Sequence, residues 1–455
     1  MSLYRKDSGG YKPKATPFGG FIDGEIACTA PHLLCVGPTG RGKSRRVLGP
    51  AALMWEGPSV LISSKPDLIE LCLEKRLELG GRDHTYVLDL SGKVPASVLP
   101  AGVEMVVADP VALITDDETA IDMAEILLQT AGSSSGGESA TKDPFFEDSS
   151  VAPLAGLLRA AGPDGIRWVR RAVGRIEPPA GEEGEEPDTV SPCWLNAIGR
   201  LERAESVMLA EELANTAAFS DRLRDSIQAT MKQAVAPWWR GSVVGPENAR
   251  PFVPSMLEHP RSTLFLVAPA DGIAAAAAVG VVDAISKHWR DGQTLPVPLQ
   301  HLLIVCDELC NTLPWKKLPV VVTEARAMGI AVLAAVQDTT QFARRYNKEI
   351  MEELRRVFPA ILILSGSEEK ELLDQAAWAA GRAERHKVST DHAGRQSQSS
   401  EMAQIYEGSD LLPRHIGEGR LLRGSRPGTD PATAVEAAGL LVELHDIDAL
   451  QFDPA

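Results

Sequence analysis

The sequence predicts an α/β protein with a mostly parallel sheet that is interrupted by an all-α inserted domain. Short apolar runs alternate with helical patterns over residues 32–109, and the same alternation resumes near Thr263. Residues 115–239 lie between these two regions and show no strand-like alternation. Alternating strands and helices form parallel sheets with helices on both faces, so we expect one sheet domain that is split in the sequence.

A glycine-rich loop follows the first apolar run, Leu33–Val36, and precedes a helical stretch over residues 45–55. It reads Gly-Pro-Thr-Gly-Arg-Gly-Lys-Ser, the complete phosphate-binding pattern, in the strand–loop–helix context that such a site needs. Its glycines let backbone N–H groups face a phosphate, and the helix amino end adds positive potential. The alternative is a surface turn, which the preceding apolar strand disfavours. The predicted ATP-binding residues are Gly37, Pro38, Thr39, Gly40, Arg41, Gly42, Lys43 and Ser44.

A pair of carboxylates follows another apolar strand, Leu302–Cys306. Ligands of open α/β sheets bind at the carboxyl ends of the strands, so Asp307 is expected beside Lys43 and Ser44. Lys43 would reach the β- and γ-phosphates, and Ser44 and Asp307 would hold Mg²⁺. Glu308 would activate the attacking water. A strand that happens to end in a charged turn is the alternative, and the complete phosphate loop makes it the weaker one.

Two further residues complete the expected catalytic set. Gln337 follows the apolar run 331–336, so it is expected at the same sheet edge, where it could sense the γ-phosphate. Its alternative is a polar strand end in solvent. Arg326 lies on a helical stretch before that run and could act on the nucleotide of a neighbouring subunit. A salt bridge to Glu324 or Glu308 explains Arg326 equally well from spacing alone.

Composition places the chain among ordinary globular proteins: 455 residues, 44% hydrophobic, 24% charged, with a formal net charge of −16. This charge counts against a protein that coats nucleic acid with its whole surface, but allows a basic face inside a ring. No segment reads as a membrane span or secretory signal, and six scattered cysteines favour a reduced intracellular protein. Five arginines lie between residues 159 and 175, and we interpret them as a solvated helix face rather than a DNA contact.

The expected organisation is a flexible segment over residues 1–20, a split nucleotide-binding domain over 21–112 and 251–455, and the all-α insertion over 113–250. The polar tract 386–400 is expected to be a mobile loop, and residues 421–444 to add strands. The expected strands of the sheet are residues 33–36, 59–62, 86–90, 264–268, 302–306, 331–336 and 361–365.

Taken together, these motifs resemble the type IV secretion coupling proteins, the TraG/TraD-like conjugative ATPases of the FtsK/HerA group. The likeness runs over most of the chain and rests on several elements besides the phosphate loop and the acidic pair. These elements are residues 59–68, Asp109–Leu113, Asp143–Phe146, Asp307–Gly329, Gln337–Gln341 with Tyr346, and residues 364–381.

The resemblance implies a RecA-like P-loop ATPase domain and a homo-hexameric motor that uses ATP and Mg²⁺. Such a motor would stand at the cytoplasmic face of a membrane, recruit DNA or a relaxase–DNA complex and drive it into a type IV secretion channel. The resemblance also favours Arg326 as the arginine that acts in trans. The inserted helices would contact substrate.

This sequence departs from the family in two respects. Members usually carry amino-terminal membrane helices, which are not seen here, so a membrane partner could replace them. Ser63 stands where the family commonly has an acid, which leaves Lys65 and Asp67 out of the expected catalytic set. Three other functions remain open: an ATPase that recruits only protein effectors, a nucleotide-gated adaptor with little turnover, and a weaker option, a small-molecule kinase.

Overall fold

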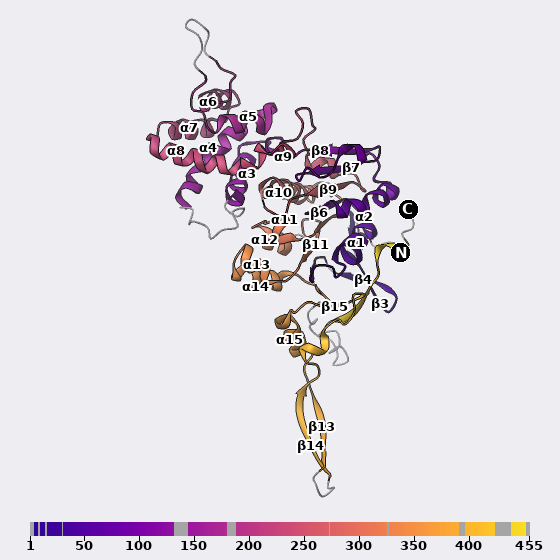
Figure 1. Cartoon of the computed structure of the whole chain (residues 1–455). Coiled ribbons are helices and arrows are strands. Elements are labelled where there is room, and N and C mark those ends of the chain that lie inside the picture. Colours follow the sequence, from indigo (N-terminus) through magenta and orange to yellow (C-terminus); the bar gives the residue numbers. More distant parts are fainter. Residues whose placement is uncertain are drawn as a thin grey trace.

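The computed structural model shows an α/β body with a helical region at one end and a two-stranded ribbon at the other (Figure 1). The main sheet has 12 strands in the order β4-β3-β16-β15-β12-β5-β11-β10-β6-β9-β7-β8. The structure describes residues 4–7, 10–13, 16–29, 31–131, 144–179, 188–272, 274–324, 327–390, 396–423 and 438–451.

Eight neighbouring strands of this sheet, from β12 to β8, are all parallel, and all but β8 were among the expected strands. The strand that precedes the phosphate loop, β5, lies between β12 and β11, and β11 separates it from β10. The bounds are β5 (Leu33–Val36), β6 (Ser59–Ser63), β7 (Thr85–Asp89), β8 (Val103–Val106), β9 (Thr263–Val267), β10 (Leu302–Cys306), β11 (Ile330–Val336) and β12 (Ile361–Leu364).

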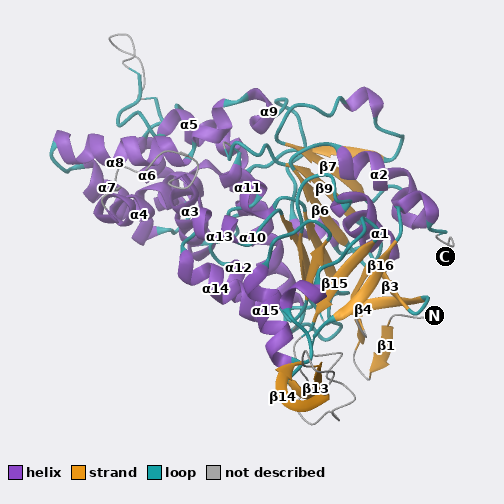
Figure 2. Ribbon diagram, turned by 60° about the horizontal axis from the view of Figure 1, so that its bottom comes forward, coloured by secondary structure: helices purple, strands orange, loops and turns teal. Residues whose placement is uncertain are grey.

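Helices cover both faces of the parallel sheet (Figure 2). Successive strand residues point to opposite faces, so Leu34 and Val36 of β5 join one hydrophobic cluster while Leu33 and Cys35 join the other. The helices α1 (Gly49–Met54) and α2 (Asp67–Arg76) belong to the second cluster. The first cluster contains α10 (Ala275–Gly292), α11 (Leu309–Thr312), α12 (Leu318–Glu324), α13 (Thr340–Arg345), α14 (Lys348–Val357) and α15 (Lys370–Ala379).

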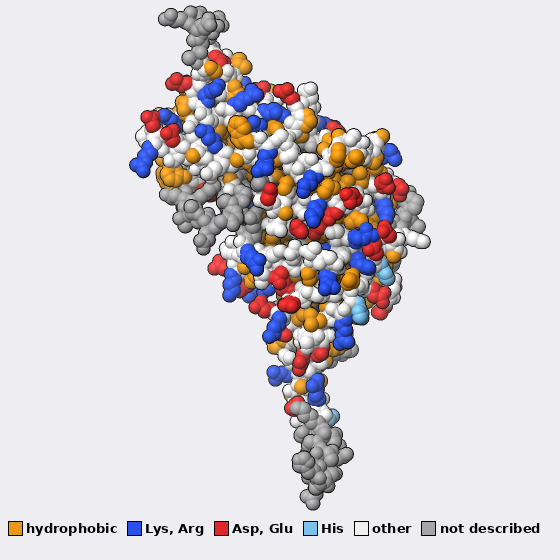
Figure 3. Space-filling view, viewed as in Figure 1, with side chains coloured by type: hydrophobic (Ala, Val, Ile, Leu, Met, Phe, Trp, Pro, Cys, Tyr) orange, Lys and Arg blue, Asp and Glu red, His pale blue; other side chains and the backbone are white. Residues whose placement is uncertain are grey.

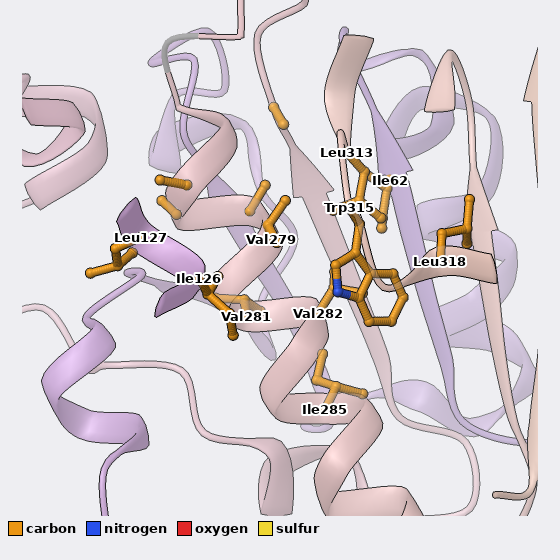
Figure 4. Packing of buried hydrophobic residues seen from close by; sticks show 14 of the residues in the cluster. Ile62, Ile126, Leu127, Val279, Val281, Val282, Ile285, Leu313, Trp315 and Leu318 are labelled. Atoms are coloured by element: carbon orange, nitrogen blue, oxygen red, sulfur yellow. The ribbon is translucent and has the colours of Figure 1, made fainter. Parts of the chain in front are cut away.

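Helix α10 joins the sheet to the inserted helices. Figure 4 shows Val282 of α10 beside Trp315, in the core between this helix and the sheet. The buried Asp283 accepts a hydrogen bond from the Trp315 ring N–H at 3.2 Å, and Lys287 lies 3.4 Å from the same carboxylate. Lys287 also pairs with Asp122 of α3 at 2.6 Å, so one lysine bridges the two regions.

Every element that the structure assigns within the described part of residues 113–250 is a helix, and loops join these helices. The arginines of this part are largely engaged within the fold: Arg159 pairs with Asp117 at 3.2 Å, and Arg170 donates to the Trp238 carbonyl at 2.6 Å. The bounds are α3 (Asp117–Ala131), α4 (Pro144–Ala161), α5 (Gly165–Ala172), α6 (Trp194–Arg203), α7 (Val207–Ala217), α8 (Asp221–Ala234) and α9 (Gly241–Val244).

Four antiparallel strands extend the sheet beyond β12. They correct the expectation of a flexible segment over residues 1–20, because Thr16–Gly20 belong to β3 and Phe18 is fully buried. Two short strands, β1 (Tyr4–Asp7) and β2 (Gly10–Pro13), pair with each other earlier in the chain. The four added strands are β3 (Thr16–Ile22), β4 (Glu25–Thr29), β15 (Glu418–Leu422) and β16 (Leu440–Leu444).

The expectation of a mobile loop over residues 386–400 is wrong in the part that the structure describes. β13 (Arg382–Thr390) and β14 (Gln396–Gln404) form a regular antiparallel ribbon with nine residue pairs. The ribbon projects away from the body (Figure 1). A ribbon that stands apart from the core needs no apolar face, so its polar sequence carried no signal for strands.

Neither cysteine pairing nor a membrane span is seen where the structure describes the chain. All six cysteines are free thiols in the structure. No described helix has both the length and the apolar character that crossing a bilayer requires.

Arg76 forms a buried polar cluster between α2 and the sheet, far in sequence from the phosphate loop. Its side chain is 1% exposed and donates to Thr263 Oγ1 at 2.9 Å. It also donates to the carbonyls of Trp55 at 2.7 Å and Gly57 at 3.1 Å. One guanidinium thus satisfies several buried acceptors around the amino ends of β6 and β9.

We expect Arg76→Ala to lower the free energy of unfolding by about 3 kcal/mol, because it leaves these buried carbonyls without a donor. Urea titration followed by circular dichroism measures the loss. Glu74→Ala, at an exposed position of the same helix, is the control and should change stability by less than about 0.5 kcal/mol. Equal stability of the two variants would contradict the structural role of Arg76.

Candidate nucleotide site

The phosphate loop leaves β5 in a conformation that depends on its glycines. Gly40 and Gly42 have φ of 79° and 87°, values that residues other than glycine rarely adopt. A Cβ on Gly42 would also lie 2.7 Å from Arg46 Cδ. The helix begins at Lys43 with a π-helical turn, Lys43–Leu48, that continues into α1. The loop therefore leads directly into the amino end of a helix, where backbone N–H groups can bind an anion.

The side chain of Lys43 folds back over the phosphate loop. Its ammonium donates to the Gly37 carbonyl at 2.7 Å and to the Pro38 carbonyl at 3.2 Å, and the residue is 8% exposed. The Gly37 N–H in turn donates to the Val336 carbonyl at 3.1 Å, which fixes the loop against β11. This arrangement places a positive charge within reach of any phosphate that the loop binds.

The phosphate loop and the acidic pair meet, although 263 residues separate them in sequence. Ser44 Oγ donates to Asp307 Oδ2 at 2.9 Å. The Asp307 N–H donates to the Ile62 carbonyl at 2.8 Å, so the end of β10 is fixed against β6. The spatial convergence that the sequence motifs predicted is thus present in the structure.

Asp307 has the properties of a magnesium ligand. Oδ1 is buried and has no hydrogen-bond partner among the described residues, while Oδ2 faces the Ser44 hydroxyl. Mg²⁺ binds hard oxygen ligands of this kind, often through its own waters, so the residues fit the ion. Burial raises the pKa of the Asp307 carboxyl, and the hydrogen bond from Ser44 and the charge of Lys43 partly oppose that rise.

Glu308 follows in a strained backbone conformation. Its φ of 52° and ψ of 48° are left-handed, which is uncommon for a residue with a side chain. One carboxylate oxygen, Oε2, accepts a hydrogen bond from Ser64 Oγ at 3.1 Å. The backbone turn and this hydrogen bond orient the carboxylate at the same sheet edge as Asp307.

Gln337 lies at the end of β11, between the loop after β5 and the acids after β10. Its N–H donates to Gln341 Oε1 at 3.2 Å, which closes a turn at the start of α13. The strand order therefore brings Gln337 to the edge expected from the sequence. Arg326 lies outside the described residues; Glu324, one of its possible partners, pairs with Arg290 at 2.9 Å.

Sequence reasoning missed Ser64 as a partner of Glu308. Ser64 directly follows β6, which neighbours β10, so the rule that ligands lie at strand carboxyl ends could have found it. That rule needs the strand order, which the motifs did not provide. The adjacent Ser63 donates instead to Asp67 Oδ1 at 2.6 Å, and the charge of Asp67 further raises the pKa of Asp307.

Comparison with known proteins supports the resemblance drawn from the motifs. Residues 301–415 match a protein-family profile described as the TraM recognition site of TraD and TraG. This segment contains β10, the acidic pair, Gln337 and the start of the turn into β15. A comparison with curated protein sequences finds no significant match.

Solved structures of a coupling protein have the same fold. The unbound monoclinic form of the bacterial conjugative coupling protein TrwB is 19% identical, with a TM-score of 0.60 over 97% of this chain and 91% of that chain. TrwB with the ATP analogue ADPNP has a TM-score of 0.56, and TrwB with ADP and Mg²⁺ one of 0.55. Both are 17% identical and cover 93% of this chain and 86% of that chain. The expected RecA-like P-loop fold is confirmed.

Because the pKa of Asp307 is raised in the folded protein, ionisation of this carboxyl lowers the free energy of unfolding. This cost is present at neutral pH, where the buried carboxylate is charged, and disappears as pH falls through the raised value toward 3.8. We therefore expect Asp307→Asn to raise the free energy of unfolding near pH 7, and the gain to shrink as pH falls. Urea unfolding between about pH 5 and pH 8 tests this.

Asp116→Asn is a control for which we expect the opposite change in the free energy of unfolding. Hydrogen bonds from the Thr119 N–H and hydroxyl lower the pKa of the exposed Asp116 carboxyl. Its charge stabilises the fold above the ordinary pKa, so this variant should lose stability at neutral pH, and the loss should diminish on acidification. A destabilised Asp307→Asn at pH 7 would contradict the cost assigned to the buried carboxylate.

Proposed function

We propose that this protein is an ATP-hydrolysing coupling protein that recruits DNA or a relaxase–DNA complex and drives it into a type IV secretion channel. The observation that carries the proposal is the contact between Ser44 and Asp307. It joins a complete phosphate loop to an acidic strand end, which are the two parts that a magnesium-dependent nucleotide hydrolase requires.

In this proposal the phosphate loop binds the triphosphate through its N–H groups and the ammonium of Lys43. Ser44 and Asp307 would hold Mg²⁺, which when bound neutralises charge on the phosphate oxygens. Glu308 accepts a proton from the attacking water, and Gln337 contacts the γ-phosphate from the neighbouring strand. Arg326 remains the proposed residue that stabilises developing charge on the nucleotide of an adjacent subunit.

Two findings support ATP as the ligand and conjugation as the process. The solved forms of TrwB include complexes with an ATP analogue and with ADP and Mg²⁺, and they share this fold. The family profile that matches residues 301–415 is described by recognition of TraM, which points to a conjugation partner for TraD and TraG. We infer the same class of nucleotide and of process for this chain.

The proposed assembly is a homo-hexamer at the cytoplasmic face of a membrane, in contact with secretion-channel components and with a membrane partner. Acidic and basic side chains are mixed over the face shown in Figure 3, in keeping with the net charge of −16. A ring could present basic groups to DNA on one inner face while its outer surface stays mixed.

Glu308→Gln should reduce ATP turnover by about 100-fold or more, because an amide cannot accept the proton of the attacking water. Turnover of the unaltered protein should rise with DNA and increase steeply with protein concentration as subunits complete each other's sites. A phosphate-release assay with single-stranded DNA of increasing length measures both effects.

Asp291→Asn provides a matched control, since Asp291 is an exposed carboxylate at the end of α10, away from this sheet edge. A turnover that does not respond to DNA of any length would favour an ATPase that recruits only protein effectors. Nucleotide binding without turnover, under conditions where rings form, would favour the adaptor.

Ser64 is proposed to position Glu308 for this reaction. Its hydroxyl donates to the carboxylate, so Ser64→Ala should leave Glu308 less well oriented toward the attacking water. We expect kcat to fall about tenfold with little change in KM, because the substitution leaves the groups that bind the phosphates in place.

Ser64→Thr, which keeps the hydroxyl, should restore most of the activity. Ser59→Ala serves as control, because Ser59 lies at the start of the same strand and its hydroxyl contacts Thr263 Oγ1 at 3.4 Å instead. An unchanged kcat in Ser64→Ala would refute the positioning role, even if the variant were less stable.

A further inference from the structure

We propose that the turn Ser365–Ser367, after β12, is the subsite for the nucleoside end of the bound nucleotide. Its Ser365 and Ser367 hydroxyls would hydrogen-bond the ribose hydroxyls and the edge of the base. The inference rests on the proposed nucleotide-binding function and adds a third segment to the site, beside the phosphate loop and the acidic pair.

The turn lies directly beside the phosphate loop. β12 pairs in parallel with β5, with Leu362 opposite Cys35 and Ile363 opposite Val36, so both strands end at the same edge. A Cβ built on Gly37 would lie 2.8 Å from Leu364 Cβ, which shows how closely the two chain segments approach. The residues that follow Leu364 therefore flank the loop that would hold the phosphates.

The turn also lies on the side of the phosphate loop that is opposite to the acidic pair. The acids after β10 and Gln337 after β11 are on one side of β5, and β12 is on the other. A triphosphate with its γ end toward Asp307 has its nucleoside end directed away from the acids. Neutral hydroxyls next to Glu368 suit ribose and base, whereas a phosphate would meet repulsion there.

Two hydroxyls in this turn are buried without partners. Ser365 is 3% exposed and Ser367 4%, and neither Oγ has a hydrogen-bond partner in the described structure. Buried hydroxyls are normally satisfied, so an unpaired pair beside a ligand loop points to a ligand that supplies the partners. The backbone itself is well fixed, since the Ser367 N–H donates to the Leu364 carbonyl at 3.2 Å.

Arg41 of the phosphate loop covers the turn. Gly366 has a φ of 81°, and a Cβ at this position would lie 2.9 Å from Arg41 Nε. The Arg41 guanidinium forms no hydrogen bond or ion pair with any described residue, and the side chain is partly exposed. A long, unpaired side chain beside the turn can move toward bound phosphate, to which a guanidinium is well suited.

The far end of the turn is anchored to the segment that carries Gln337. Glu369 is buried and accepts hydrogen bonds from the Thr339 N–H at 2.7 Å and from its hydroxyl at 2.8 Å. Arg355 of α14 lies 3.4 Å from the same carboxylate. The turn thus has one end beside the phosphate loop, and Glu369, just beyond its other end, is fixed by hydrogen bonds from Thr339, as a preorganised subsite requires.

The test compares a ligand that has a nucleoside with one that lacks it. Magnesium ADP and magnesium tripolyphosphate are titrated into the unaltered chain and into the double variant Ser365→Ala/Ser367→Ala by calorimetry. We expect the double variant to lose about tenfold in ADP affinity while its tripolyphosphate affinity stays within about twofold. Ser286→Ala, which removes a buried hydroxyl from α10, should change neither affinity.

The outcomes separate this inference from the function on which it rests. An equal loss for both ligands, or no loss for ADP, would overturn the subsite while leaving the phosphate site in place. Binding of neither ligand by the unaltered chain would overturn the nucleotide site and the subsite together. Thermal unfolding of the double variant should be unchanged or slightly higher, because the substitution removes two unpaired polar groups.

Discussion

The hydrogen bond between Ser44 and Asp307 is the contact on which the rest of the site depends. It joins the amino-terminal and carboxyl-terminal parts of the split sheet at one point, and it satisfies one oxygen of a buried carboxylate. The charge of that carboxylate is costly to bury, as the raised pKa shows, and the fold accepts this cost at the edge where a cation would bind.

Strand order explains why the other residues gather around this contact. Because β11 lies between β5 and β10, Gln337 must come between the phosphate loop and the acids, and because β6 adjoins β10, Ser64 must come beside Glu308. On the opposite side, β12 brings Ser365 to the loop. In a parallel sheet, strand ends that are distant in the sequence thus place their side chains in a single row at one edge.

The sequence predicted the parts of this fold whose signals are local. The apolar runs of β5, β10 and β11 are buried on both faces and read directly as strands, and the loop from Gly37 has a pattern of its own. The order of those strands is set by contacts between distant segments, so the neighbours Ser64 and Ser365 could not be recognised as site residues.

Among the strands that escaped prediction, β3 and the ribbon of β13 and β14 did so for reasons of their own. β3 was missed because its Thr16–Gly20 stretch is rich in glycine and proline and becomes a strand only by pairing with β4 and β16. The ribbon of β13 and β14 pairs only with itself and stands away from the core (Figure 1), so burial does not shape its sequence. Hydrophobic periodicity can reveal only those strands that cover a core.

The buried polar groups around Arg76 are satisfied, whereas three buried polar atoms at the carboxyl edge of the sheet are not. Near the amino ends of β6 and β9, the Arg76 guanidinium is fully used, with donors directed at Thr263 and at several carbonyls. At the carboxyl edge, Asp307 Oδ1 and the hydroxyls of Ser365 and Ser367 have no partner among the described residues. Unpartnered buried atoms also occur elsewhere, at His32 Nε2 and Gln300 Oε1, so the significance of the two hydroxyls comes from their position. Their retention beside a phosphate loop is the pattern expected where stability is given up for ligand binding.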